Sequence, residues 1–385
     1  MKFLHTADWQ IGKPFESIED PAKRERLRSA RLESIRALRP LVEEHGAAFV
    51  VVCGDLFDSS LPDRATVSAL CGAVGSLGVP VYSIPGNHDF GGPGSLWEEE
   101  FFQAERTSLA PDWQPLLAPR PHPLADAVLL PCPLLRRHEA LDPTQWLRTV
   151  PEDLPDDLPR LVLAHGSTQG FSSEKDENSA DAANRIDLAH LPAGAYDYVA
   201  LGDWHGTKQV ADNPPAWYAG TPEPDRFPRG EDNRPGHVLL VETDGHGVPP
   251  RVTPVSTARI GWHAPDPVSL QGPEDLKALA ETLATLLGPR TDRDLLRLTL
   301  EGALGLAELD QLRDLLETYH ARLLSLEVDQ RVLPEPTEEE LHSLTGGEDP
   351  LIARVARTLA EEAGTDPASR ELLRELYLQV RAHSP

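Results

Sequence analysis

The chain has 385 residues, of which 40% are hydrophobic and 25% charged, and this composition is that of a folded globular protein rather than a disordered one. Its length suggests two or three domains. Lysine and arginine number 36 against 62 aspartates and glutamates, giving a net charge of −26. Such a charge repels polyanions at long range, which excludes binding of nucleic acid through the general surface. Metal ions or a partner would have to supply positive charge to a phosphodiester substrate.

The sequence also argues against membrane and disulfide-rich classes. No apolar run approaches the roughly 20 residues that a membrane-spanning helix needs. The N-terminus reaches Asp8 too early for a signal peptide. Cys53, Cys71 and Cys132 are widely spaced and fit neither a disulfide nor a metal pattern. We therefore expect reduced, buried thiols and a cytoplasmic, nucleoid-associated protein without a membrane partner.

Strands and helices alternate through the first part of the chain. The apolar runs predict strands at residues 3–7, 47–53, 79–84, 127–130, 160–164, 196–201, 217–220 and 237–242. Amphipathic spacing predicts helices over 23–45, with the stem of Arg31 lying along the apolar stripe, and over 63–77. Residues 93–125 are rich in proline and aromatics and show no clear pattern. The fold class is α/β, and the first domain covers residues 1–257.

The pattern changes after this domain. Residues 258–333 predict a small α/β module, with helices over 273–287 and 306–321 between short strands. Residues 334–385 open with a Pro-Glu-Pro run and predict two helices, over 350–363 and 367–382. We expect this last segment to be an exposed helical tail or a docking element.

Five polar clusters stand at the carboxyl ends of predicted strands. In α/β sheets, such ends bring residues from distant parts of the chain to one edge. Each cluster alone is weak evidence, because a lone Gly-Asp is usually a turn and a lone histidine is usually a core group. Their joint occurrence is hard to produce by turn chemistry. The residues concerned are Asp8 and Gln10, Asp55 and Asp58, Asn87 and His88, His165, and Asp203 and His205.

These side chains suit a pair of divalent cations. Asp55 can bridge both ions, while the other oxygens and imidazoles serve as terminal ligands. Two such ions clamp a phosphoryl group and generate a hydroxide for in-line attack. His88 would then face the substrate as a general acid or as an electrostatic partner for developing charge. Asp58 is the expected orienter of that imidazole.

The motif series resembles the calcineurin-like metallophosphoesterases. It comprises Asp8-x-Gln10, Gly54-Asp55-x-x-Asp58, Gly86-Asn87-His88-Asp89, His165-Gly166 and Gly202-Asp203-Trp204-His205. Residues 196–202 and the run Gly220-Thr221-Pro222-Glu223-Pro224 narrow the resemblance to SbcD-type DNA-repair exonucleases. The resemblance implies a four-layer α/β/β/α sandwich followed by a capping domain. It also implies a tail that docks on an SMC-like coiled-coil ATPase, and a possible homodimer.

The resemblance also implies how the ligands divide. One ion would use Asp8, Gln10, Asp55 and His205, and the other Asp55, Asn87, His165 and Asp203. Gln10 and Asp203 stand where the family usually has histidines. Exchanging two imidazoles for oxygen ligands favours Mn²⁺, with Mg²⁺ as the alternative, over zinc. We therefore expect two divalent ions, most favourably Mn²⁺.

The substrate is less well defined than the reaction. The resemblance favours DNA, cleaved as an exonuclease and possibly also as an endonuclease. Arg24, Arg26 and Arg28, on the helix after the first motif, are candidate phosphate contacts, although each could equally be a solvated surface group. Two alternatives stay open. One is a small-substrate phosphodiesterase or phosphatase of the same superfamily, and the other is a non-catalytic scaffold for the ATPase.

Overall fold

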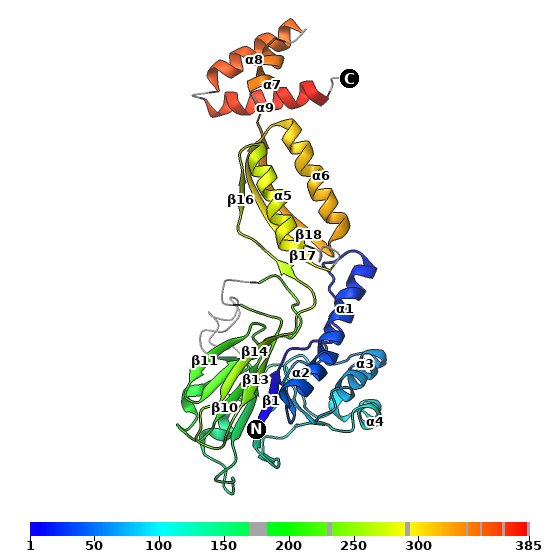
Figure 1. Cartoon of the computed structure of the whole chain (residues 1–385), viewed down its shortest axis with the longest axis vertical. Coiled ribbons are helices and arrows are strands. Elements are labelled where there is room, and N and C mark those ends of the chain that lie inside the picture. Colours follow the sequence, from blue (N-terminus) through cyan, green and yellow to red (C-terminus); the bar gives the residue numbers. More distant parts are fainter. Residues whose placement is uncertain are drawn as a thin grey trace. The chain divides into compact units, whose positions relative to one another are not determined.

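The structure is a computed structural model that describes residues 1–168, 183–228, 233–288, 293–335, 338–346, 349–363 and 366–382. The chain forms two compact units, Met1–Gly261 and Trp262–Pro385 (Figure 1). Both are mixed α/β in secondary structure. The expected boundary between a module ending at 333 and a tail beginning at 334 stays a prediction.

The first unit contains two six-stranded sheets. In the first sheet the strand order is β14-β13-β1-β2-β3-β4. Strands β1 to β4 run parallel to one another, whereas β13 and β14 are antiparallel. The strands are β1 (Lys2–Thr6), β2 (Val50–Cys53), β3 (Val81–Ile84), β4 (Trp113–Pro115), β13 (His237–Glu242) and β14 (Arg251–Ser256).

The second sheet has the order β11-β12-β10-β7-β6-β5. Its central strands β12, β10, β7 and β6 are parallel, and antiparallel strands lie at both edges. The strands are β5 (His122–Pro123), β6 (Val128–Cys132), β7 (Arg160–His165), β10 (Tyr198–Gly202), β11 (Lys208–Asp212) and β12 (Pro215–Tyr218). A separate short pair joins β8 (Ser167–Thr168) to β9 (Arg185–Ile186).

The two sheets pack face to face. One apolar cluster combines Phe3 and Val51 of the first sheet with Leu129 and Leu161 of the second. The outer face of the first sheet packs in a second cluster with α1 (Pro21–Arg36), α2 (Leu38–His45), α3 (Arg64–Gly75) and α4 (Glu100–Leu109). Among the described residues, the outer face of the second sheet has only the short turns η2 (Gln145–Arg148) and η3 (Leu188–His190) in its cluster. The expected helical fourth layer is therefore not confirmed.

Two parts of the first unit differ from the sequence expectation. The single helix expected over 23–45 is broken, because α1 ends at Arg36 and α2 begins at Leu38. The unreadable segment 93–125 contains η1 (Leu96–Glu98), α4 and β4. Its aromatics Trp97, Phe102 and Trp113 are buried and meet edge to face. Packing among these rings, rather than a periodic apolar pattern, orders the segment.

The second unit contains a four-stranded sheet with two helices. Leucines of both helices and of β17 form its core. A separate apolar cluster joins Leu344, Ala356, Leu373 and Tyr377 of three further helices, the first of which was not predicted. The elements are β15 (Trp262–His263), β16 (Val268–Leu270), α5 (Pro273–Leu287), β17 (Leu295–Leu304), α6 (Leu306–Arg322), β18 (Ser325–Pro334), α7 (Glu338–Thr345), α8 (Pro350–Glu362) and α9 (Pro367–Ala382).

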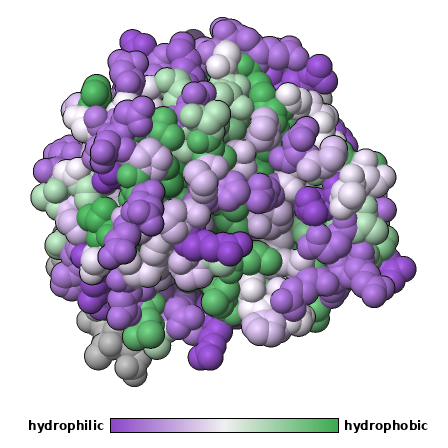
Figure 2. All heavy atoms as spheres, turned by 90° about the horizontal axis from the view of Figure 1, so that it is seen from below, coloured by the Kyte–Doolittle hydropathy of each residue, from purple (hydrophilic) through white to green (hydrophobic). Residues whose placement is uncertain are grey.

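The face shown in Figure 2 is largely hydrophilic, with apolar residues in small groups between polar ones. In the described part of the chain, no helix is both long and apolar enough to cross a bilayer. Cys53, Cys71 and Cys132 are free and buried, as the sequence predicted. Burial raises the pKa of the Cys71 thiol to about 12, so this thiol is a packing group rather than a reactive one.

Candidate metal centre

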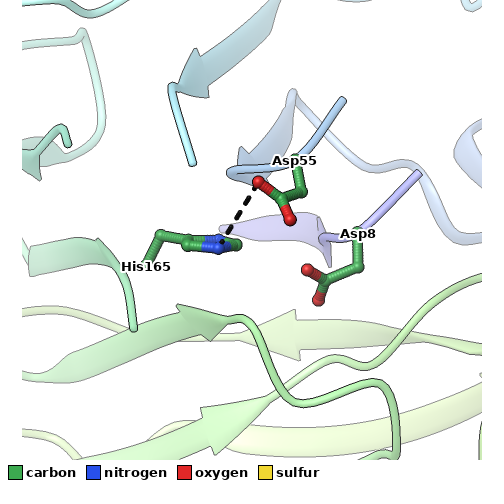
Figure 3. Close-up of side chains that lie close together, drawn as sticks. All are labelled: Asp8, Asp55 and His165. Atoms are coloured by element: carbon green, nitrogen blue, oxygen red, sulfur yellow. Dashed lines mark ion pairs between the residues drawn. The ribbon is translucent and has the colours of Figure 1, made fainter. Parts of the chain in front are cut away.

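Three predicted residues form a compact cluster of possible ligands. Asp8 follows β1, Asp55 follows β2, and His165 ends β7 in the other sheet. One ligand atom of each lies within 4.8 Å of those of the other two, and all three residues are buried. Their side chains converge on one point (Figure 3). Carboxylate and imidazole groups held together in this way are suited to a divalent cation.

Main-chain bonds hold the turns after β1 and β2 together. The N–H of Asp8 donates to the carbonyl of Gly54 at 3.1 Å, and that of Gln10 donates to the carbonyl of Asp55 at 2.8 Å. Asp8, Gln10, Asp55 and Asp203 all have positive φ, at 54°, 41°, 53° and 104°. They are four of the seven non-glycine residues with positive φ in the described chain. Such strained conformations gather at functional sites.

Glycines permit the close approach of these turns. A Cβ on Gly86 would lie 2.2 Å from Oδ1 of Asp55, and one on Gly202 would lie 1.8 Å from the carbonyl oxygen of Cys53. Neither space could hold a methyl group without displacing backbone or a ligand. The turn after β3 and the end of β10 therefore pack directly on the turn after β2.

His165 is oriented for binding a cation. Its Nδ1 donates to the carbonyl of Cys53 at 2.8 Å. Its Nε2 lies 2.9 Å from Oδ1 of Asn87 and 3.6 Å from Oδ1 of Asp55. With Nδ1 fixed as a donor, contact with these oxygens requires a proton on Nε2. A cation that replaced this proton would meet one nitrogen and two oxygens, so the donor set fits a divalent ion.

The electrostatics of the cluster follow from its burial. Burial raises the pKa of Asp8 to about 6, although His205 and His165 oppose the rise. Burial also disfavours a charged His165, but Asp55, Asp8 and Asp203 together raise its pKa to about 9. The protonated ring therefore neutralises part of the carboxylate charge when no cation does so.

His88 lies beside the cluster with its side chain partly exposed. Its main-chain N–H donates to Oδ1 of Asp55 at 2.9 Å, and its Nε2 is 3.9 Å from Oδ2 of Asp55. The Nδ1 of the ring contacts the main-chain carbonyl of Asp58 at 2.7 Å. The group that orients His88 is therefore the carbonyl of Asp58 and not the expected carboxylate, which instead lies 3.6 Å from Nζ of Lys13.

The two departures from the family pattern each have a partner. Asp203 accepts from Oγ of Ser167 at 2.9 Å, and its main-chain N–H donates to both carboxylate oxygens of Asp8. Nε2 of Gln10 lies 3.4 Å from Nε2 of His205, while Nζ of Lys13 donates to Oε1 of Gln10 at 2.9 Å. All nine predicted site residues thus lie in or directly beside one network.

Sequence reasoning missed three buried residues that hold this network. Asp89 accepts from the N–H groups of Leu56, Phe57 and Gly86, and so joins the turns after β2 and β3. Asp225 accepts from Nδ1 of His205 at 3.0 Å. Burial opposes its charge, yet the His205 ring and nearby arginines hold the pKa of Asp225 well below its usual range.

Arg31 is the third missed residue, because its charged group is buried and does not extend to solvent beyond an apolar stem. It donates to main-chain carbonyls of Asp8 at 3.0 Å and Glu223 at 2.9 Å, and also to that of Trp9. Asp89 and Glu223 both stood in the motifs, and their acidic character was the signal that could have drawn attention to them.

The candidate DNA contacts lie on α1. Arg24 is half-buried, whereas Arg26 and Arg28 are exposed. Arg28 donates to the main-chain carbonyls of Lys13 and Pro14, at 3.3 and 3.4 Å. This residue therefore already has a structural role at the turn that follows β1.

Comparison with known proteins identifies the family. The calcineurin-like phosphoesterase family matches residues 1–207. This chain belongs to that family. Phosphoester hydrolysis is accordingly its family chemistry, and Asp8, Asp55 and His165 form a candidate site for divalent metal.

Two solved structures are similar at low identity. One is the crystal structure of TT1561 of Thermus thermophilus, with 12% identity, a TM-score of 0.40, and coverage of 66% of this chain and 98% of that one. A second crystal structure has 14% identity with the same TM-score and coverage.

Metal binding should release a proton. At pH 7.5 the cation-free His165 ring is charged because its pKa is about 9, and a ligand imidazole must lose that proton. Between pH 7 and 8 the logarithm of apparent affinity should rise by about one per pH unit. Below pH 6 it should rise by about two, since Asp8, with a pKa of about 6, must also ionise.

Calorimetric titration of Mn²⁺ in buffers of different ionisation enthalpy measures this release. The variant His190→Gln, at a ring about half exposed on η3, should release the same number of protons as the wild type. An affinity independent of pH between 7 and 8 would contradict the assignment of His165 as a ligand.

Proposed function

We propose that this protein is a metal-dependent phosphodiester hydrolase acting on DNA, with His88 facing the scissile phosphate. The observation that carries the proposal is the meeting of five strand ends from two sheets, with buried Asp8, Asp55 and His165 at the centre and a partly exposed His88 at the margin. A bound divalent cation would supply positive charge to a phosphoryl group. Asp8, Asp55, Asn87, His165 and Asp203 would hold it.

The surroundings of His88 support its proposed role. The Asp58 carbonyl orients one ring nitrogen, which leaves Nε2 on the side of Asp55. A histidine fixed at one nitrogen can hold or deliver a proton at the other. Its partial exposure allows a bulky substrate to reach it, whereas the fully buried His165 is not accessible in this way.

Oxygen ligands favour Mn²⁺ as the cation, with Mg²⁺ as the alternative. Asn87 and Asp203 add oxygens to the carboxylates of Asp8 and Asp55, while His165 contributes the one imidazole on this side. This balance of donors is harder than that of a typical zinc site.

Hydrolysis of an aryl phosphodiester with added Mn²⁺ tests the reaction. Asn87→Ala and His88→Ala should each lower kcat/KM by about 100-fold or more, because one removes a ligand and the other the group facing phosphate. His190→Ala is the control and should keep full activity. Absence of activity with every divalent metal would support the scaffold alternative. Stoichiometric zinc that sustains the highest rate would reject the Mn²⁺ assignment.

DNA as substrate rests on the SbcD-type motif resemblance and on the basic side chains of α1. Neutralising Arg24, Arg26 and Arg28 to glutamine should reduce the slope of log Kd against log salt by up to about three phosphate contacts. Binding of labelled single strands, blunt ends and hairpins at several salt concentrations measures this slope.

The control variant changes Arg36 and Arg39, which pair with Glu33 and Glu43 of their own helices, and it should leave the slope unchanged. An unaltered slope in the triple variant would exclude these contacts. Hydrolysis of the aryl ester without cleavage of any DNA would favour the small-substrate alternative, which the net charge of −26 also favours.

The second unit supports a proposed partner. Leu351 and Val355, four residues apart on α8, are 71% and 41% exposed, and Leu372 of α9 is 58% exposed. Apolar side chains exposed on one helical face are suited to a helical partner. We propose the coiled coil of an SMC-like ATPase as that partner; a homodimer stays a prediction.

Leu351→Glu with Leu372→Glu should abolish co-purification with the cognate ATPase while leaving aryl phosphodiester hydrolysis unchanged, because both residues lie outside the first unit. Leu286→Glu, at a partly exposed leucine of α5, is the matched control and should keep the complex. Undiminished complex formation by the double variant would reject this docking surface.

A further inference from the structure

The position expected for one of the two cations is closed by protein groups. The ligands implied for it are Asp8, Gln10, Asp55 and His205. Asp8 and Asp55 also belong to the cluster around His165. The donors that would distinguish this position are therefore the amide oxygen of Gln10 and a ring nitrogen of His205.

Lys13 determines which way the Gln10 amide points. Its Nζ lies 2.9 Å from the atom assigned as Oε1 of Gln10. An ammonium group only donates hydrogen bonds, so the atom facing it must be the oxygen and not the NH₂. The orientation of the amide therefore follows from the chemistry of its neighbour. The one oxygen that Gln10 could offer to a cation is occupied by Lys13.

The remaining donor is occupied in the same way. Nδ1 of His205 contacts the carboxylate of Asp225 at 3.0 Å, so Nδ1 carries the proton and Nε2 has the lone pair. The NH₂ of Gln10 faces that lone pair at 3.4 Å. Two ligands of one ion could also be 3.4 Å apart, but an amide NH₂ is not a metal ligand. The identity of the atoms, not their distance, excludes the ion here.

Lys13 is held in place from several sides. Its Nζ lies 3.0 Å from Oδ2 of Asp225 and 3.6 Å from Oδ1 of Asp58, and its side chain is only 21% exposed. The Asp225 carboxylate is itself buried and bound by Arg226 as well. A fixed ammonium group next to the Gln10 oxygen repels a divalent ion at the same place.

We propose that the centre binds a single divalent cation, at Asp8, Asp55, Asn87, His165 and Asp203, and that the Lys13 ammonium takes the place of the second. This inference rests on the proposed function, because it concerns the same site. It departs from the two-ion expectation at the residue where the motif departs from the family pattern. Gln10 and Lys13 are a coupled pair, in which the lysine needs an uncharged acceptor where a histidine would bind metal.

Metal stoichiometry of the full chain tests this inference without reference to activity. Calorimetry and electron paramagnetic resonance with Mn²⁺ alone should give one tight ion per chain and the six-line spectrum of an isolated ion. The double variant Lys13→Met with Gln10→His removes the ammonium and supplies an imidazole. It should bind two ions per chain and show the broadened spectrum of a coupled pair. Lys277→Met, at an exposed lysine of α5, is the charge-matched control and should still bind one.

Each outcome decides the point. Two coupled ions in the wild type would overturn the inference and leave the proposed hydrolase intact. No tight ion in the wild type would overturn both. A folded double variant that still binds one ion would show that Lys13 does not close the position. The wild-type stoichiometry alone remains decisive if thermal melting shows that the double variant is unfolded.

Discussion

The buried guanidinium of Arg31 ties the turn after β1 to the segment after β12. It donates to carbonyls of Asp8, Trp9 and Glu223, and to the hydroxyl of Thr221 at 3.2 Å. Burial lowers the pKa of Arg31, whereas Asp225 and Glu223 oppose that shift. Without this donor the carbonyls would be buried and unpaired, at a cost of about 1–3 kcal/mol each. Arg31 thus holds the left-handed backbone that directs Asp8 into the cluster.

Much of this site was predictable because strand ends are readable from apolar runs. Asp55, Asn87 and His165 each follow such a run, and the parallel order of β1, β2 and β3 brings their turns to one edge. Helix boundaries were less accessible. Nothing in the amphipathic pattern marks the break at Ala37, and the 93–125 segment depends on ring-to-ring contacts that carry no period.

The supporting contacts were not predictable, because they join distant residues through atoms that no motif specifies. Arg31 and Glu223 are 192 positions apart, and Gln10 and His205 are 195 apart. The orientation of His88 depends on a main-chain carbonyl, which every residue possesses, so sequence reasoning assigned the role to the Asp58 carboxylate instead. Lys13 looked like an ordinary surface lysine until the fold placed Asp225 beside it.

These contacts bear on whether the centre is functional or decayed. A site under no constraint should lose partners as its residues change, leaving buried polar atoms unsatisfied. Here each substituted position has gained one: Ser167 donates to Asp203, and Lys13 donates to Gln10. The strained φ angles of Asp8, Gln10, Asp55 and Asp203 are also retained, and such strain persists only where surrounding structure enforces it. A scaffold would need neither feature, so the geometry favours an enzyme whose metal requirement has changed.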